Sequence, residues 1–294
     1  VYWDDGAQIV EPHADGVVDE VNAIKDLSEI KIISEEEARS KGLIIDIGAE
    51  IDDKYIETIK KEAIQTDIQG KGDFKIVYSP LHGTGKRPVE RVLKEMGFNA
   101  VYTVASQAEP DGTFPTVGYA NPEEPAVFKL GIELAEEVGA TICMANDPDA
   151  DRIGIAVKDG DKWTYPNGNQ VGLLLMNYIL ENKKDIPVNG AVISTVVSTP
   201  MLETVAKAHG VKVYRTLTGF KYIGEKIREF ETGALDGTYL FGFEESFFNF
   251  SISSCGITAK KSHNNSGFSL LCIAHKCCFS NITSKTSSYL PCSR

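Results

Sequence analysis

The chain has 294 residues, of which 42% are hydrophobic and 24% are charged, and its formal net charge is −12. This length is typical of two or three domains, and the composition is that of a globular protein, which excludes a collagen or a fully disordered chain. The acidic charge disfavours a general nucleic-acid binder, no apolar stretch reaches the ~20 residues of a membrane span, and no signal peptide opens the chain, so we expect a cytoplasmic protein with neither a nucleic-acid nor a membrane partner.

The first 70 residues carry a weak pattern. We expect helices at 19–24, 35–41 and 53–64, and a strand at 42–47. A block of this size buries little surface on its own, and the chain begins with Val1 rather than Met. We therefore interpret residues 1–70 as the remnant of a larger domain.

Strands and helices alternate through residues 71–165. Apolar residues recur at i, i+3, i+4 and i+7 from Val89 to Met96, which is one face of a helix, and Gly97 is the residue type that ends one. The other expected elements are a helix at 125–138 and strands at 75–78, 100–104, 140–145 and 153–157.

Residues 166–250 repeat this alternation. Thr199 and Pro200 predict the start of a helix, and Gly210 predicts its end. The other expected elements are helices at 170–180 and 220–230 and strands at 191–197, 211–215 and 238–243. Successive strand–helix–strand units are typical of parallel sheets, so we predict successive α/β domains with mixed, mostly parallel sheets.

The last segment, 251–294, differs in composition from the rest. It contains no Asp or Glu and holds five of the six cysteines, and the first 250 residues hold only Cys143. The cysteine spacing fits no paired CxxC zinc pattern. We predict a disordered tail, produced by a frameshifted or mispredicted terminus.

The sharpest motif is NDPDADR at residues 146–152, between two apolar strands. Its carboxylates stand at i, i+2 and i+4, and crowding them without a cation would be costly. Mg²⁺ prefers such oxygen ligands, and an adjacent arginine suits a phosphate oxygen. An EF-hand is excluded because Arg152 and Lys158 occupy the positions that need Gly and Glu. A solvated acidic turn is the plain alternative.

Three further loops also follow predicted strands. HGTGK at 82–86 precedes a helix, where backbone N–H groups favour anions, but it lacks the pattern of a Walker loop or a dinucleotide fingerprint. LTGFK at 217–221 places Lys221 in a first helical turn, where its charge opposes the helix dipole unless an anion binds there. GFEES at 242–246 offers carboxylates and a hydroxyl suited to sugar hydroxyls. For each loop the alternative is an ordinary turn.

Loops at the carboxyl ends of strands are where α/β sheets bind ligands. A divalent-cation triad, anion-binding loops, a lysine and a hydroxyl-binding carboxylate together indicate a phosphorylated sugar and Mg²⁺ as ligands.

These motifs resemble those of the α-D-phosphohexomutases, the phosphoglucomutase/phosphomannomutase superfamily. DPDADR is similar to the metal loop of this family, TLTGFK to its phosphosugar loop and GFEES to its sugar-binding loop. HGTG, EPDGTFPTVGYANPEEP and VYWDDGAQI are similar to further family landmarks. The resemblance covers residues 1–250, and the spellings look most like bacterial phosphoglucomutases.

The resemblance implies the phosphohexomutase type of α/β fold, with the end of domain 1 at 1–70, domain 2 with the metal loop at 71–165 and a truncated domain 3 with the sugar-binding loop at 166–250. No segment resembles the phosphoserine loop of domain 1 or the phosphate loop of domain 4. We therefore expect a fragment that is inactive alone.

The implied reaction interconverts glucose 1-phosphate and glucose 6-phosphate through a bisphosphate, with a phosphorylated hexose as substrate. The resemblance assigns a role to each matching residue: Mg²⁺ to Asp147, Asp149 and Asp151; catalysis to Arg152 and Lys221; substrate binding to Thr218, Gly219, Glu244 and Ser246.

Other functions remain open on the sequence. The chain could be a non-catalytic Mg²⁺- and phosphosugar-binding remnant, or the sugar could be a mannose or pentose phosphate. A phosphatase that uses the first Asp of the triad as nucleophile is disfavoured, because Asp151 stands where Thr or Val is usual. The oligomeric state is not indicated.

Overall fold

A computed structural model of the chain describes residues 8–245 and 249–252. The strands of the first sheet are β1 (Ile76–Ser79), β2 (Val101–Thr103), β3 (Ile142–Asn146), β4 (Ile153–Asp159) and β5 (Lys162–Thr164). The strands of the second sheet are β6 (Gly190–Thr195), β7 (Lys212–Thr216), β8 (Thr238–Glu244) and β9 (Asn249–Ile252). None of the helices in this part of the chain has the length and apolar character that crossing a membrane requires.

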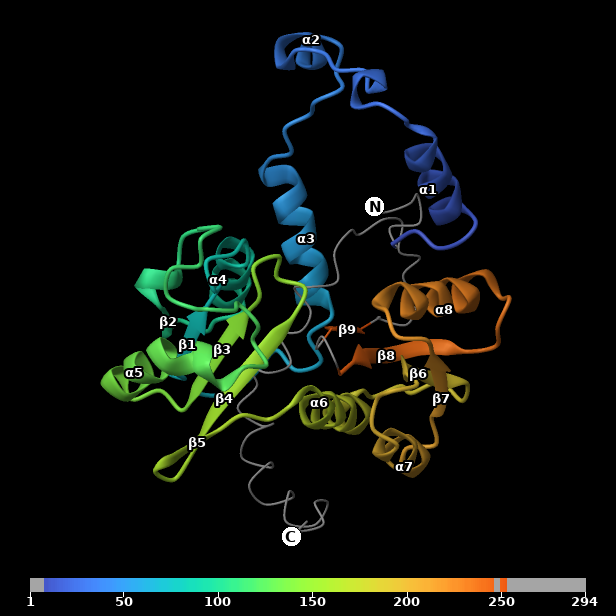
Figure 1. Cartoon of the computed structure of the whole chain (residues 1–294). Coiled ribbons are helices and arrows are strands. Elements are labelled where there is room, and N and C mark those ends of the chain that lie inside the picture. Colours follow the sequence, from blue (N-terminus) through green and yellow to red (C-terminus); the bar gives the residue numbers. More distant parts are fainter. Residues whose placement is uncertain (1–7, 246–248, 253–294) are drawn as a thin grey trace.

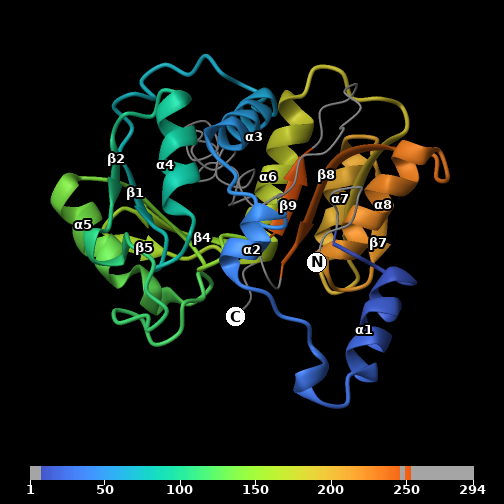
Figure 2. The same cartoon turned by 90° about the horizontal axis from the view of Figure 1, so that it is seen from above.

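Helices cover both sheets. Those beside the first sheet are α3 (Ala49–Lys61), α4 (Lys86–Glu95) and α5 (Lys129–Val138), with the short 3₁₀ turns η2 (Ala105–Gln107) and η3 (Pro125–Phe128). Those beside the second sheet are α6 (Gly168–Asn182), α7 (Met201–Ala208) and α8 (Phe220–Thr232). Figures 1 and 2 both place α6 between the two sheets.

The two sheets share one plan. In the first, β1 pairs in parallel with β2 and β3, and β4 returns antiparallel to β3. In the second, β6 pairs in parallel with β7 and β8, and β9 returns antiparallel to β8. The prediction of an α/β fold with mixed, mostly parallel sheets is confirmed.

Alternate residues of a strand belong to different apolar clusters, because successive side chains point to opposite faces of the sheet. On β1, Ile76 and Tyr78 join a large apolar cluster with α6, and Val77 joins a second cluster under α5. The large cluster continues through α6 to Phe241 and Phe243 of the second sheet. One continuous core therefore fixes the two sheets against each other.

Helix α6 and strand β8 approach each other closely in this core. A Cβ atom built on Gly172 would lie 2.4 Å from the ring of Phe243, so only glycine fits there. Because Phe243 immediately precedes Glu244, this contact also sets the position of the carboxyl end of β8.

The N-terminal segment differs from its prediction in its first helix, which begins at His13 rather than at 19, and at the predicted strand 42–47. Helices α1 (His13–Ala23) and α2 (Glu35–Ser40) are present, with a 3₁₀ turn η1 (Leu27–Glu29) between them. The predicted strand at 42–47 is wrong: Leu43 and Ile45 are largely exposed, and no strand within the described residues lies beside this segment. A strand without a partner leaves its backbone groups unpaired, so its β-type sequence is not enough.

Other elements form with shifted ends. Helix α3 begins at Ala49 rather than at 53, because the Glu50 side chain accepts a hydrogen bond from the Gly48 N–H and acidic residues favour a first turn. Pro200 takes the N-cap position of α7, and the hydroxyl of Thr199 accepts from the Met201 N–H. The antiparallel strands β5 and β9 were not expected.

The Gly172 contact can be tested with alanine. Gly172→Ala should lower the free energy of unfolding by about 1–3 kcal/mol, because the added methyl overpacks against Phe243. Gly16→Ala is the matched control, since this glycine is also helical but has open space around it. Urea unfolding followed by circular dichroism should show no loss for Gly16→Ala, and equal effects of the two changes would contradict the packing described here.

Candidate active site

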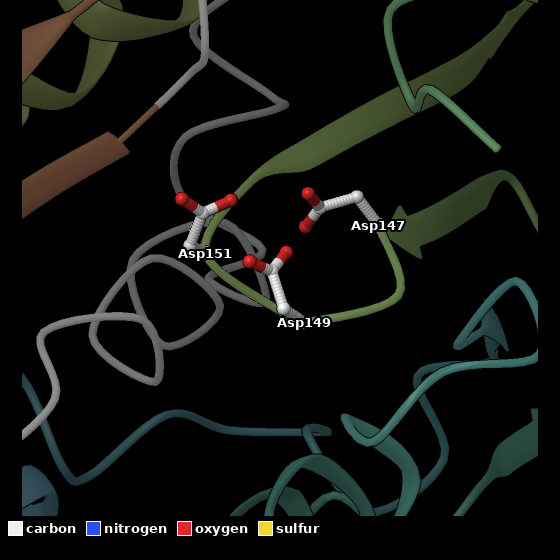
Figure 3. Close-up of side chains that lie close together, drawn as sticks. All are labelled: Asp147, Asp149 and Asp151. Carbon is white, nitrogen blue, oxygen red and sulfur yellow. The ribbon is translucent and has the colours of Figure 1, made fainter. Parts of the chain in front are cut away.

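The triad occupies the loop between β3 and β4. Asp147 follows directly after β3 and is fully buried, whereas Asp149 is exposed and Asp151 is half-exposed. One carboxylate oxygen from each lies within 4.8 Å of the others. Figure 3 shows the three side chains gathered at this loop. A set of three carboxylates this close fits a hard cation such as Mg²⁺, which takes oxygen ligands.

Arg152 compensates only part of this charge. Its Nε donates to Asp147 Oδ2 at 2.7 Å, its backbone N–H donates to Asp147 Oδ1 at 2.9 Å, and Nε lies 3.4 Å from Asp151 Oδ1. Burial, a hydrogen bond with Asp149 and the charge of Asp151 raise the pKa of Asp147 to about 8, against the opposing effect of Arg152. One cation among three carboxylates leaves a site suited to a second positive charge.

Hydrogen bonds among residues 146–152 hold the backbone of the loop between β3 and β4. Ala150 adopts a left-handed φ of 61°, and its N–H donates to the Asp147 carbonyl at 3.0 Å. The side chain of Asn146 donates to the Arg152 carbonyl at 2.6 Å and lies 3.3 Å from the Tyr78 hydroxyl. The chain therefore turns tightly enough to bring alternate carboxylates together.

The HGTGK loop packs against the loop that carries the triad. The Thr84 N–H donates to the Pro148 carbonyl at 2.8 Å, and a Cβ atom on Gly83 would lie 2.3 Å from Pro148 Cα. The sequence suggested that backbone N–H groups of this loop favour an anion. In the structure, the Thr84 N–H is engaged by the metal loop instead.

A polar network, buried except at Thr116, holds the HGTGK loop in turn. His82 is buried with a positive φ of 63°, and its Nε2 lies 2.8 Å from the Thr116 hydroxyl. Gln107 donates to the same hydroxyl at 3.0 Å and accepts from the Ser79 hydroxyl at 2.7 Å. Buried polar groups that are all bonded in this way specify one loop conformation.

The second sheet brings two of the predicted sugar-site residues together. Glu244 is buried at the end of β8, and its carboxylate accepts from the Gly219 N–H at 3.0 Å. Gly219 is the N-cap of α8, with a φ of +128° that favours glycine. Thr218 is exposed beside it. The loops after β7 and β8 thus meet at one edge of the sheet.

Lys221 and Ser246 complete the predicted set. Lys221 lies in the first turn of α8, as the sequence predicted, and its Nζ is 4.9 Å from the centroid of the Tyr222 ring. Ser246 lies outside the described residues, as does nearly all of the predicted tail.

Sequence reasoning did not select Glu245 or Glu123. The Glu245 carboxylate accepts from the hydroxyls of Ser198 and Thr195. Partial burial raises the pKa of Glu123, the positive charge of Arg152 lowers it, and Glu245 raises it. The charges of Arg152, from the loop after β3, and of Glu245, from the loop after β8, thus both act on the pKa of Glu123. Adjacent carboxylates in EES and PEEP were the available signal.

Burial of Asp147 predicts a pH dependence. Burial, Asp149 and Asp151 raise the pKa of its carboxyl from the ordinary 3.8 to about 8, so the folded state should bind more protons than the unfolded state between these two values. Without metal, the free energy of unfolding should therefore fall as pH rises from about 5 to 8, by at most about 1.4 kcal/mol per unit. Mg²⁺ affinity should rise over the same range, because the ion replaces the proton.

Calorimetric melting in EDTA and titration with Mg²⁺ at several pH values would check this. Asp147→Asn should flatten the dependence of stability on pH. An unchanged slope in this variant would contradict the assignment to Asp147.

The close approach of Gly83 to Pro148 gives a second test. Gly83→Ala should displace the metal loop and weaken Mg²⁺ binding by about tenfold or more, as loss of a supporting contact does at metal sites. Gly118→Ala is the control, because nothing lies within 4 Å of a Cβ atom there. Calorimetric titration would measure both, and equal affinities in the two variants would contradict the supporting role of the loop.

Comparison with known proteins matches the segment around each sheet to a domain of known type. The profile of phosphoglucomutase/phosphomannomutase alpha/beta/alpha domain II matches residues 53–160, and that of domain III matches residues 167–259. Phosphoglucomutase of Staphylococcus epidermidis is 33% identical over 254 residues, which are 84% of this chain and 44% of that protein. Phosphopentomutase of Mus musculus is 34% identical over 256 residues, 84% of this chain and 40% of that protein. The chain thus spans less than half the length of these relatives.

Solved structures show the same fold. A phosphoglucomutase/phosphomannomutase family protein from Burkholderia thailandensis superposes with a TM-score of 0.56 at 22% identity, over 76% of this chain and 42% of that one. Parafusin from Paramecium, in its open form, superposes with a TM-score of 0.51 at 18% identity, over 81% of this chain and 39% of that one.

Proposed function

The chain belongs to the phosphoglucomutase/phosphomannomutase superfamily, and from this membership we propose that it supplies the metal-binding and sugar-binding parts of a phosphohexomutase site. The reaction interconverts glucose 1-phosphate and glucose 6-phosphate through a bisphosphate intermediate. The observation that carries this proposal is the gathered acidic triad with Arg152 at the end of β3, in a sheet packed beside the one that presents Glu244.

Asp147, Asp149 and Asp151 would hold the ion, which we propose to be Mg²⁺. When bound, the ion would offset negative charge on the phosphoryl group in transfer. Arg152, fixed on Asp147 through its Nε and its backbone N–H, would bind a phosphate oxygen at the edge of the triad. Its role is to orient the phosphoryl group beside the carboxylates.

The second sheet would bind the sugar. Glu244, oriented by the Gly219 N–H, would accept hydrogen bonds from sugar hydroxyls together with Ser246. Thr218 and Lys221 would contact the phosphosugar at the start of α8, where the helix dipole favours an anion. The phosphoserine implied by the family resemblance has no matching residue in this sequence, so no nucleophile is assigned.

The phosphatase alternative would use Asp147 as its nucleophile. Both oxygens of this buried carboxylate accept from Arg152, and one of them lies within 4.8 Å of oxygens of Asp149 and Asp151. Three carboxylates gathered around one point suit a shared cation. We therefore propose that Asp147 is a metal ligand rather than a nucleophile.

Calorimetric titration of the full chain with Mg²⁺ and then with glucose 1-phosphate tests the proposal. Asp149→Asn should weaken Mg²⁺ binding by about tenfold or more. Asp161→Asn is the control, because Asp161 is exposed in the β4–β5 turn and lies outside the triad. Absence of Mg²⁺ binding, or equal losses in both variants, would contradict the metal assignment.

Turnover and sugar preference are measured next. The assay follows glucose 6-phosphate formation with a glucose 1,6-bisphosphate primer. Turnover lost in Asp149→Asn would support the mutase, whereas Mg²⁺-dependent binding without turnover would support a non-catalytic phosphosugar-binding protein. Tighter binding of mannose 1-phosphate or ribose 1-phosphate than of glucose 1-phosphate would contradict the glucose assignment.

A further inference from the structure

The loop at 195–199, here called the β6 loop, occupies the place in the second sheet that the HGTGK loop occupies in the first. Each follows the strand that pairs in parallel with both of its neighbours, β1 or β6, and each contacts the acidic loop after one of those neighbours. In the first sheet the contact joins Thr84 to Pro148. In the second it joins Ser198 and Thr195 to Glu245. The β6 loop is therefore placed to support the sugar-binding loop.

The hydroxyls that make this contact are buried. Thr195 has no exposed surface and Ser198 is 5% exposed, so neither can reach a ligand directly. Ser194, also buried, lies 2.8 Å from the Ser198 hydroxyl and donates to the Phe243 carbonyl at 2.7 Å. These hydroxyls fix Glu245 while its neighbour Glu244 is held by Gly219. The two adjacent carboxylates are thus anchored on different loops.

The backbone of the β6 loop depends on Arg215 of β7. Its Nη1 donates to the carbonyls of Thr195 at 2.6 Å and Ser198 at 3.2 Å, and its Nη2 donates to the carbonyl of Thr199 at 3.0 Å. Nε and Nη2 also donate to the Glu203 carboxylate, each at 2.9 Å. All five N–H groups of the guanidinium are used in this way.

Only arginine offers this arrangement. Three carbonyls of one tight loop converge on a planar fork, and the opposing carboxylate holds that fork in place. Lysine would keep the positive charge, but it has three rotatable donors on one atom and cannot span the same acceptors. A change to lysine therefore separates the geometry of Arg215 from its charge.

We infer that Arg215 is a positioning residue for the sugar-binding loop: it fixes the β6 loop, whose Thr195 and Ser198 hydroxyls hold Glu245 and so set the direction of Glu244. The inference rests on the proposed function for the role of Glu244 in sugar binding. Arg215 touches neither the sugar nor the metal in this scheme.

The experiment compares Arg215→Lys and Ser198→Ala in the full chain. Both should weaken binding of glucose 1-phosphate at saturating Mg²⁺ by about fivefold or more, the effect of one or two lost hydrogen bonds. Both should leave Mg²⁺ affinity within about twofold, because the triad is held by the other sheet. The affinity of the double variant for glucose 1-phosphate should be close to that of the single variant with the lower affinity, since both changes act through Glu245.

The control is Arg91→Lys. Like Arg215, Arg91 donates to carboxylates, here those of Asp53 and Glu95, but its hydrogen bonds are not to the β6 loop. This variant should bind glucose 1-phosphate as the unchanged chain does. Unchanged affinity in Arg215→Lys, or strictly additive losses in the double variant, would overturn the inference.

Hydrogen exchange separates this inference from the proposed function. Arg215→Lys should speed amide exchange at 195–199 and 241–245 and leave the rest of β6 and β7 unchanged, whereas a merely structural role would speed exchange across the whole sheet. If the unchanged chain binds no glucose 1-phosphate, the proposed function fails, and the exchange pattern alone decides the role of Arg215.

Discussion

A carboxyl group without exposed surface needs hydrogen-bond partners, and this requirement at Asp147 organises the loop at the end of β3 in the first sheet. Arg152 meets it with two hydrogen bonds from one residue, which forces the chain into a tight turn with Ala150 in the left-handed region. That turn brings Asp149 and Asp151 toward the same point. The HGTGK loop then packs against Pro148 so closely that only Gly83 fits. The supporting contacts thus gather around one buried carboxyl group.

The second sheet meets a similar problem with different chemistry. Its acidic loop presents two neighbouring carboxylates, and each is held by a separate neighbour: Glu244 by a backbone N–H at the start of α8, and Glu245 by hydroxyls of the β6 loop. Arg215 works on the backbone of the supporting loop rather than on the acidic loop itself. The two sheets, with a similar strand order, therefore present an acidic triad after one strand and a pair of neighbouring carboxylates after another.

Helix α6 connects these two edges. It contributes to one continuous apolar cluster with both sheets, and Gly172 packs directly on Phe243 beside Glu244. A hydrogen bond from Gln65 to Asn182 at 2.6 Å joins the segment after α3 to the end of the same helix. Displacement of α6 would change the separation of the metal loop and the sugar-binding loop, so the packing of this helix bears directly on the proposed site.

Elements with strong apolar periodicity formed where the sequence predicted them. Their apolar faces must be buried in any α/β packing, so the local pattern is enough to predict them. The central strands β1, β3, β6 and β8 and the helices α4, α6 and α8 belong to this group. The segment 42–47 did not form a strand, and the strands β5 and β9 were not expected. Strand formation depends on a neighbour that pairs the backbone, which a local pattern does not specify.

The sequence by itself determined the α/β class, the acidic triad and the order of the four loops, because closely spaced residue types define each of them. Only the tertiary structure decided that Asp147 is the buried member of the triad and that the HGTGK loop supports it. Only the tertiary structure joined Glu245 to hydroxyls 47 and 50 positions away. Burial and hydrogen bonding depend on segments brought together by packing, and no local spacing encodes them.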